Sequence, residues 1–169
     1  MNIDCIKIDG LLIRNVPPEL QTREMQAEAV MNNGLALQYI ENPAKDIQFL
    51  AVTNNGLAIQ FIQNPDREIQ RLAVIHNGLA IQYIKNPSEK IQLLAVLHNG
   101  FAVQFIPNPT LAMQLVAVKA DEYAIEYLDN PCEAVQIAAL RKNIYTFKVI
   151  KNMTPGARKF AIQIDPWIT

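Results

Sequence analysis

The chain has 169 residues, half of them apolar and only 18% charged, and its formal net charge is −1. This length is typical of about one domain and is large enough to bury a sizeable core. The balanced charge argues against a polybasic nucleic-acid binder and against an acidic disordered tail. Amides are unusually frequent, since the chain holds 15 Asn and 13 Gln beside only 6 Gly and 10 Pro.

The sequence favours a cytoplasmic protein without membrane contact. Its N-terminus lacks the basic and apolar regions of a signal peptide, and no apolar run approaches the ~18 residues that span a bilayer. The two cysteines, Cys5 and Cys132, lie far apart. This separation suggests free thiols in a reducing compartment.

Residues 1–20 precede the regular part of the chain, and we expect them to form an N-terminal cap. Residues 3–13 leave two structures open. Gly10-Leu11-Leu12-Ile13 is compatible with a degenerate short helix, whereas the same region around Asp9-Gly10 is compatible with a β-hairpin. Pro17-Pro18 marks a linker into the first full unit.

Residues 21–152 are a tandem repeat with a period of 22 residues. Five Asn-Pro pairs carry this period: Asn42-Pro43, Asn64-Pro65, Asn86-Pro87, Asn108-Pro109 and Asn130-Pro131. A glutamine stands five residues after each proline: Gln48, Gln70, Gln92, Gln114 and Gln136. Four glycines share the spacing: Gly34, Gly56, Gly78 and Gly100. So many positions in register predict stacked structural units.

Each unit is predicted to contain a long and a short helix. Asn64 is a suitable N-cap and Pro65 fits the first helical position. Within that helix Ile69, Leu72 and Ala73 form one apolar face. We expect the helix to end where Asn77 or Gly78 adopts the left-handed conformation. The short helix that follows has about two turns and must form by docking on its neighbours.

The long helices are therefore expected near residues 22, 43, 65, 87, 109 and 131, and the short ones near 34, 56, 78, 100, 122 and 144. After Asn152-Met153 the register slips, and Pro155-Gly156 opens a final helix that ends near Ile164. Residues 153–169 are expected to form a C-terminal cap. The predicted fold class is all-α: an α-solenoid of about six 22-residue helix-turn-helix repeats with irregular terminal caps.

The repeated motif is Asn-Gly-(Leu/Phe)-Ala-(Ile/Val/Leu)-Gln-(Tyr/Phe)-Ile, followed by Asn-Pro-x-x-x-Ile-Gln-x-x-Ala-Val. It resembles the short tandem-repeat modules of a domain-of-unknown-function family found in phage, giant-virus and bacterial proteins. It is also similar to leucine-rich-repeat-variant and HEAT-like solenoids; units of the former pair an α-helix with a short 3₁₀ helix. The resemblance covers residues 20–152. It implies a binding solenoid of phage or bacterial source and carries over no catalytic residue.

Two further patterns run along the repeat. An aromatic residue recurs in each short helix, and we expect these rings to pack between neighbouring units, although bases could stack on such a row: Tyr39, Phe61, Tyr83, Phe105 and Tyr127. A second amide row, Gln38, Gln60, Gln82 and Gln104, is expected to be solvated or to bond between units. The first glutamine row is expected to satisfy loop carbonyl groups.

The outward face of the long helices is the candidate binding surface. Counted from Asn, positions seven and eleven are expected to point outward, and in the middle units they are apolar. Contiguous exposed apolar surface usually marks an interface. The candidate partner-binding residues are Phe49, Arg71, Ile75, Leu93, Leu97, Leu111 and Leu115. The alternative is that the curl of the solenoid or the terminal segment covers this face.

No enzyme motif is present, and every predicted helix is explained by the repeat. The sequence therefore predicts a non-catalytic protein-binding scaffold without cofactor or metal, such as a phage or bacterial adaptor or inhibitor acting in the cytoplasm, the host's if it is phage-encoded. A nucleic-acid or nucleotide binder that uses the amide rows and the basic residues between Arg141 and Lys159 is the less favoured alternative. The third hypothesis is a self-assembling module that forms homo-oligomers through the apolar long-helix face.

Overall fold

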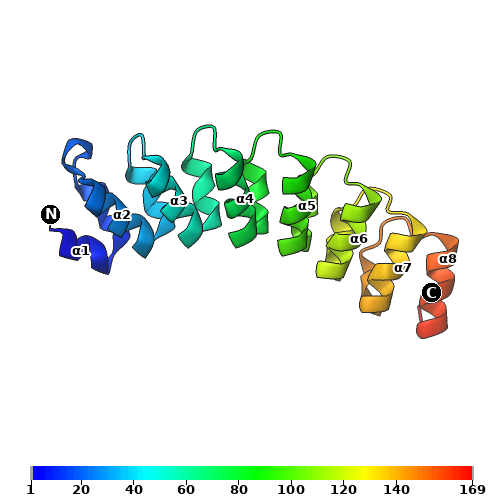
Figure 1. Ribbon diagram of the computed structural model, residues 1–169. Helices are drawn as coiled ribbons and strands as arrows, with labels where there is room; N and C mark the ends of the chain where they lie inside the picture. The colour runs from blue at the N-terminus through cyan, green and yellow to red at the C-terminus, as the bar shows by residue number, and fades with distance from the viewer. Residues whose placement is uncertain (1, 169) are drawn as a thin grey trace. The chain divides into compact units, whose positions relative to one another are not determined.

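A computed structural model describes residues 2–168 of the chain, which form an all-α repeat solenoid (Figure 1). The chain divides into two compact units, one ending at Pro87 and the other starting at Ser88. The α-helices of the first unit are α1 (Ile3–Ile8), α2 (Arg23–Asn32), α3 (Lys45–Asn54) and α4 (Arg67–His76). Its 3₁₀ helices are η1 (Gly10–Asn15), η2 (Pro18–Leu20), η3 (Gly34–Tyr39), η4 (Gly56–Phe61) and η5 (Gly78–Tyr83).

The second unit repeats the same alternation. Its α-helices are α5 (Glu89–His98), α6 (Leu111–Ala120), α7 (Glu133–Lys142) and α8 (Pro155–Ile164). Its 3₁₀ helices are η6 (Gly100–Phe105), η7 (Glu122–Tyr127) and η8 (Ile144–Lys148). Within each unit every α-helix packs on the next α-helix and on the 3₁₀ helices beside it. The predicted fold class is therefore confirmed.

The short helices lie where the sequence places them, but most are six-residue 3₁₀ helices. The Asn or Asp that precedes each of these short helices is its N-cap. Its side-chain oxygen accepts a hydrogen bond from the backbone N–H of the second helical residue. Asn55 Oδ1, for example, accepts from the backbone N–H of Leu57 at 3.0 Å. Asp9 and Asp121 cap Leu11 and Tyr123 in the same way. Such tight, short helices are stable only when docked.

The Asn-Pro pairs do not start the long helices as predicted. The asparagines adopt left-handed backbone conformations with φ between 47° and 55°: Asn42, Asn64, Asn86, Asn108 and Asn130. The helix begins two residues after the proline, and the residue between them is the N-cap. Thr110 Oγ1 accepts from Met113 N at 3.3 Å in this role. The prediction was wrong because a residue before proline avoids the helical region and asparagine tolerates the left-handed one.

The predicted left-handed helix ends are also wrong. Asn77 is extended, with φ −153°, and no glycine among the described residues has a positive φ. The glycine is needed for space instead. A Cβ atom on Gly34 would overlap the carbonyl oxygen of Ala51 in the next repeat, and Gly56 meets Ala73 in the same way. The repeats thus stack backbone against backbone at this position.

The core consists of three positions on each of the long helices α3 to α6, of two to four on α2, α7 and α8, and of the inner side of the short helices. In α4 these positions are Ile69, Ala73 and Val74, all at most 1% exposed. Leu72, predicted to belong to the core, is only half-buried, so Val74 takes its place. Ala58 and Ile59 supply the matching buried side chains from η4.

The two ends of the chain follow the repeat more closely than the sequence suggested. Residues 3–13 are helical, not a hairpin, since α1 and η1 form a shortened long-and-short pair. The register slip predicted after Asn152-Met153 does not occur in the helices, because α8 begins 22 residues after α7. The segment between them differs, since η8 is one residue shorter than η3 to η7 and the turn after it has another geometry. Gln136 holds this turn by donating to the carbonyl oxygen of Asn152 (3.0 Å) and accepting from Thr154 N (2.9 Å).

Candidate protein-binding surfaces

The first glutamine row has a structural role within each repeat. Gln48, Gln70 and Gln114 each donate from Nε2 to the carbonyl oxygen of the proline five residues earlier, at 2.8–3.0 Å. Gln136 makes the same bond to Pro131 at 2.8 Å. These amides satisfy loop carbonyl groups, as predicted. They close the Asn-Pro turn of their own repeat, and in Gln136 also the turn that follows.

The predicted partner-binding residues are not all equally exposed. Phe49 on α3 is 39% exposed, and Leu93, Leu97 and Leu111 on α5 and α6 are 41%, 61% and 51% exposed. Arg71 on α4 is also exposed. Ile75 and Leu115 were predicted to be exposed but are half-buried, so they contribute less accessible surface than the sequence suggested.

In the first unit, ion pairs cover the start of the long helices. Arg23 on α2 contacts Asp46 at 2.7 Å, and Lys45 on α3 contacts Asp66 at 2.7 Å. The hydrogen bond from Arg23 lowers the pKa of Asp46. The hydrogen bond from Lys45, with the backbone N–H of Ile69, lowers the pKa of Asp66. Phe49 and Arg71 therefore lie on a mixed surface whose charges are largely paired.

The outward face of the second unit differs in character. Leu111 and Ala112 stand where the first unit has its charged pairs, and Leu93 and Leu115 occupy equivalent positions on the packed helices α5 and α6. We call Leu93, Leu97, Leu111 and Leu115 the leucine face. Because α5 and α6 are in contact, these four side chains lie on neighbouring helices of one unit.

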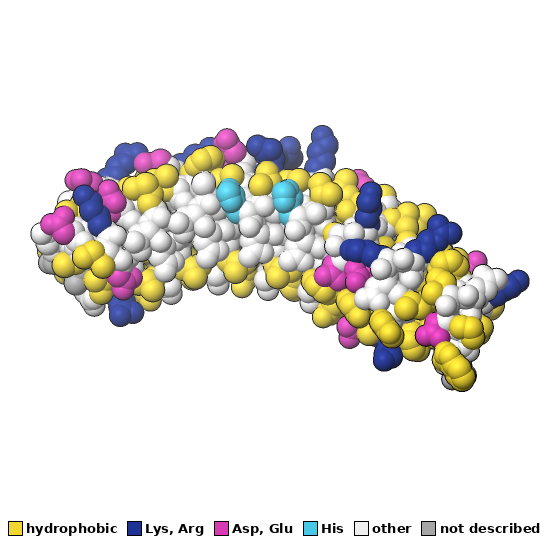
Figure 2. All heavy atoms as spheres, turned by 90° about the horizontal axis from the view of Figure 1, so that it is seen from below, with side chains coloured by type: hydrophobic (Ala, Val, Ile, Leu, Met, Phe, Trp, Pro, Cys, Tyr) yellow, Lys and Arg dark blue, Asp and Glu magenta, His cyan; other side chains and the backbone are white. Residues whose placement is uncertain are grey.

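Basic residues border the leucine face on its C-terminal side. An open cavity of about 450 Å³ between α6 and α7 is lined by Leu115, Val118, Lys119, Ala138, Arg141 and Lys142. Figure 2 shows dark blue Lys and Arg among yellow apolar side chains in this part of the chain. Lys142 is paired with Glu122 at 3.0 Å, and it also donates to the carbonyl oxygens of Lys119 and Ala120. Backbone N–H donation to Glu122 and its bond from Lys142 lower the pKa of Glu122.

The predicted basic end is spread over α7 and α8. Arg141 stacks on the Phe160 ring at 5.5 Å from the ring centroid, which fixes its guanidinium against α8. Arg158 and Lys159 are exposed and line an apolar depression of about 640 Å³ with Ile162 on the outer side of α8. Lys148 and Lys151 lie between α7 and α8, at the end of η8 and in the turn that follows, and both are exposed.

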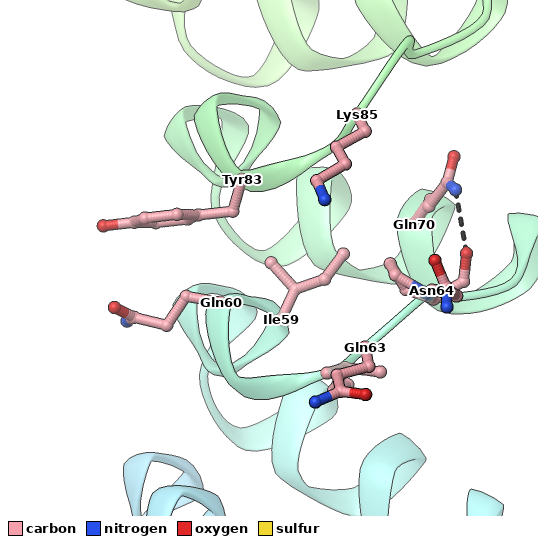
Figure 3. A pocket seen from close by; sticks show the side chains of 9 residues that line it. Ile59, Gln60, Gln63, Asn64, Gln70, Tyr83 and Lys85 are labelled. Carbon is pink, nitrogen blue, oxygen red and sulfur yellow. Dashed lines mark hydrogen bonds between the residues drawn. The ribbon is translucent and has the colours of Figure 1, made fainter.

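A second kind of surface was not predicted from the sequence. Grooves open between successive 3₁₀ helices, beside the Asn-Pro turns. Figure 3 shows one of about 620 Å³, with Tyr83 and Lys85 on one wall and Ile59, Gln60 and Gln63 on the other. The aromatic and amide rows were recognised in the sequence, but the aromatic rings were predicted to pack between neighbouring units. Tyr83 and Tyr127 are 40% and 45% exposed, so they are only partly packed.

The described residues contain no group of three or more His, Cys, Asp or Glu side chains placed to share a metal ion. Both cysteines are free and exposed. Among the helices of residues 2–168, none combines the length and apolar character needed to cross a bilayer.

Comparisons with known proteins give no relative: no family model matches the chain, and neither a curated protein nor a solved structure is similar enough to count as a match.

Proposed function

We propose that this chain is a non-catalytic protein-binding scaffold whose second unit engages a partner through the leucine face. The observation that carries this proposal is the exposure of Leu93, Leu97 and Leu111, at 41%, 61% and 51%. Full burial of an exposed leucine stabilises by about 1.5–3 kcal/mol, and a partner that covers the exposed half of each of these side chains gains roughly half of that. Exposed apolar patches of this kind mark interaction sites.

The border of the leucine face indicates which partner surface fits. Lys119 and Arg141 lie beside Leu115 around the same cavity, and both are exposed. A complementary surface therefore has apolar anchors with acidic side chains at one edge. An adaptor or inhibitor that acts on a cytoplasmic protein is the biological setting that we propose for such a surface.

The experiment compares capture by the full chain and by two variants. The double variant Leu97→Asp/Leu111→Asp changes the two most exposed leucines of the face, so it should fold as the wild type does. Met31→Asp is the matched control, because Met31 is 47% exposed on α2 of the first unit. We expect wild type and control to retain a specific partner, and the double variant to bind it at least tenfold more weakly, since two buried anchors contribute more than ~1.4 kcal/mol.

Retention of the partner by the double variant would place the interface elsewhere. Light scattering of the purified chain tests the self-assembly alternative, since an oligomer of the wild type that becomes a monomer in the double variant would make the leucine face a homotypic contact. Salt-sensitive binding of single-stranded RNA that needs Lys119 and Arg141 would instead favour the nucleic-acid alternative.

A further inference from the structure

Two grooves in the first unit have the same construction one repeat apart. In each, an isoleucine forms the floor, an Asn-Pro turn closes one end, and the aromatic residue of the next 3₁₀ helix forms a wall. Ile40, Asn42 and Phe61 have these roles in the groove between η3 and η4, which measures about 390 Å³. Ile62, Asn64 and Tyr83 have them in the groove between η4 and η5, which measures about 620 Å³; Figure 3 shows Asn64 and Tyr83 of this groove. The two grooves share Ile62 and Gln63, so they adjoin.

An exposed amide stands on each of the 3₁₀ helices η3, η4 and η5, and the one on η4, Gln60, lines the larger groove. The Nε2 atoms of Gln38, Gln60 and Gln82 donate to the backbone oxygen three residues earlier at 3.0–3.1 Å. This bond fixes the orientation of each side chain and uses one of its hydrogens. A carbonyl oxygen and a second N–H remain at each exposed amide, which are the groups that match a peptide unit. A fixed amide also costs a ligand less ordering entropy.

The spacing of the repeat matches an extended polypeptide. Packed helices lie about 8–10 Å apart, so equivalent groups of neighbouring repeats are separated by about this distance. A polyproline-II chain advances about 3.1 Å per residue and has three residues per turn, or ~9.3 Å. Every third side chain of such a segment would enter successive grooves, while its backbone passes the row of amides.

The charges of the grooves select the chemistry of that segment. Among the described residues that line the two grooves, Lys85 is the only cationic one, and it lies on the wall of the larger groove. Figure 3 shows its side chain reaching over the groove. The positions equivalent to Lys85 in the two preceding repeats are occupied by Gln63 and Glu41, and neither residue is basic. A nucleic-acid strand needs a basic track to neutralise its phosphates, which this row lacks.

We propose that the first unit binds an extended, polyproline-II-like acidic peptide segment across η3, η4 and η5, with one acidic side chain beside Lys85. Gln38, Gln60 and Gln82 contact its backbone, and Phe61 and Tyr83 separate its side chains. This site lies on a different unit from the leucine face and goes beyond the function proposed for that face. It makes the chain a scaffold with two distinct kinds of binding surface.

The test uses the full chain and a phage-displayed library of random 12-residue peptides, followed by fluorescence anisotropy with the selected peptide. We expect selected sequences to contain Asp or Glu and proline with a three-residue spacing. Lys85→Glu should weaken binding at least tenfold, and exchange of the peptide's acidic residue for lysine should restore binding to this variant. Gln60→Ala/Gln82→Ala should also weaken binding, whereas Lys7→Glu, a charge reversal on α1, should not.

Three outcomes would overturn the proposal. The first is a selection that enriches no sequence, or sequences without the three-residue spacing. The second is a selected peptide whose affinity is unchanged by Lys85→Glu, or lost with Leu97→Asp/Leu111→Asp, which would place it on the leucine face. The third is binding of a ten-nucleotide oligouridylate that Lys85→Glu abolishes, which would assign the grooves to a nucleic-acid strand. Circular dichroism of each variant ensures that lost binding is not lost folding.

Discussion

At the scale of single residues, the stacking of repeats depends on the absence of one methyl group. Gly56 lies against the backbone of the next repeat, where an added Cβ would overlap the carbonyl oxygen of Ala73 and come within 3.0 Å of Asn77 N. Backbone atoms cannot rotate away as a side chain can. The helices would have to separate, and overpacking of this kind typically costs about 1–3 kcal/mol.

Gly56→Ala should therefore lower the free energy of unfolding by about 1–3 kcal/mol, measured as a lower midpoint in urea. Gly156→Ala is the matched control, because the atoms nearest to its added methyl group belong to the Glu133 carboxylate. That side chain can move aside, so the loss should be smaller. Equal losses in both variants would contradict steric exclusion between backbones as the reason for glycine.

Asparagine shows what sequence reasoning could and could not predict at this scale. The period of 22 residues made it clear that these amides belong to the repeat. It did not distinguish an N-cap from a left-handed turn or a short-helix cap, because asparagine suits all three. Asn64 adopts the turn, Asn55 caps η4, and Asn54 joins two repeats by accepting from Gly34 N and donating to Met31 O at 2.7 Å. Packing between repeats decides among roles of similar local energy.

At the scale of elements, glutamine side chains form hydrogen bonds with backbone groups of the turns that have no partner within a helix. Gln136 is the extreme case, since it is 1% exposed and makes bonds to Pro131, Asn152 and Thr154. The turn before α8 lacks the left-handed asparagine found in other repeats. Gln136 is the buried side chain that holds this turn, and the exposed bonds from Asn152 to Asn130 and from Thr154 to Glu133 add to it.

Gln136→Ala should destabilise the chain by about 2–3 kcal/mol, because it leaves buried backbone groups unsatisfied. Gln60→Ala should cost less than about 0.5 kcal/mol, since that side chain is exposed and bonds only within its own helix. Urea denaturation of both variants is the measurement. A small effect at Gln136 would mean that water replaces its bonds.

The candidate surfaces were predictable only in part, for a reason that lies in the packing of elements. Periodicity identified the outward side of the long helices and thus Leu93 and Leu97. It could not show that packing within the stack half-buries Ile75 and Leu115. The grooves between 3₁₀ helices were missed because their walls come from successive repeats, and their depth follows from turn geometry that the sequence does not display.

At the scale of the whole molecule, stability is expected to vary along the stack. Within each unit, the described helices pack on elements near them in the sequence, as in other repeat proteins. In the second unit α7 packs on both α6 and α8, whereas α8 packs, among the elements of the described residues, on α7 and η8 alone. The difference is visible at one position of the repeat. Leu140 on α7 is 1% exposed, but its equivalent on α8, Ile162, is 40% exposed.

We therefore expect amide hydrogen exchange to be faster in α8 than in α7, because local opening of α8 breaks the contacts of one neighbour only. Exchange measured by NMR or mass spectrometry at low protein concentration tests this expectation. Equal protection of α7 and α8 would show that another surface covers Ile162, and loss of that protection on dilution would identify it as a second copy of the chain.

Leu140→Ala should lower the free energy of unfolding by about 2–5 kcal/mol, as measured by urea denaturation. Ile162→Ala should lower it much less, since the Ile162 side chain is already partly in water.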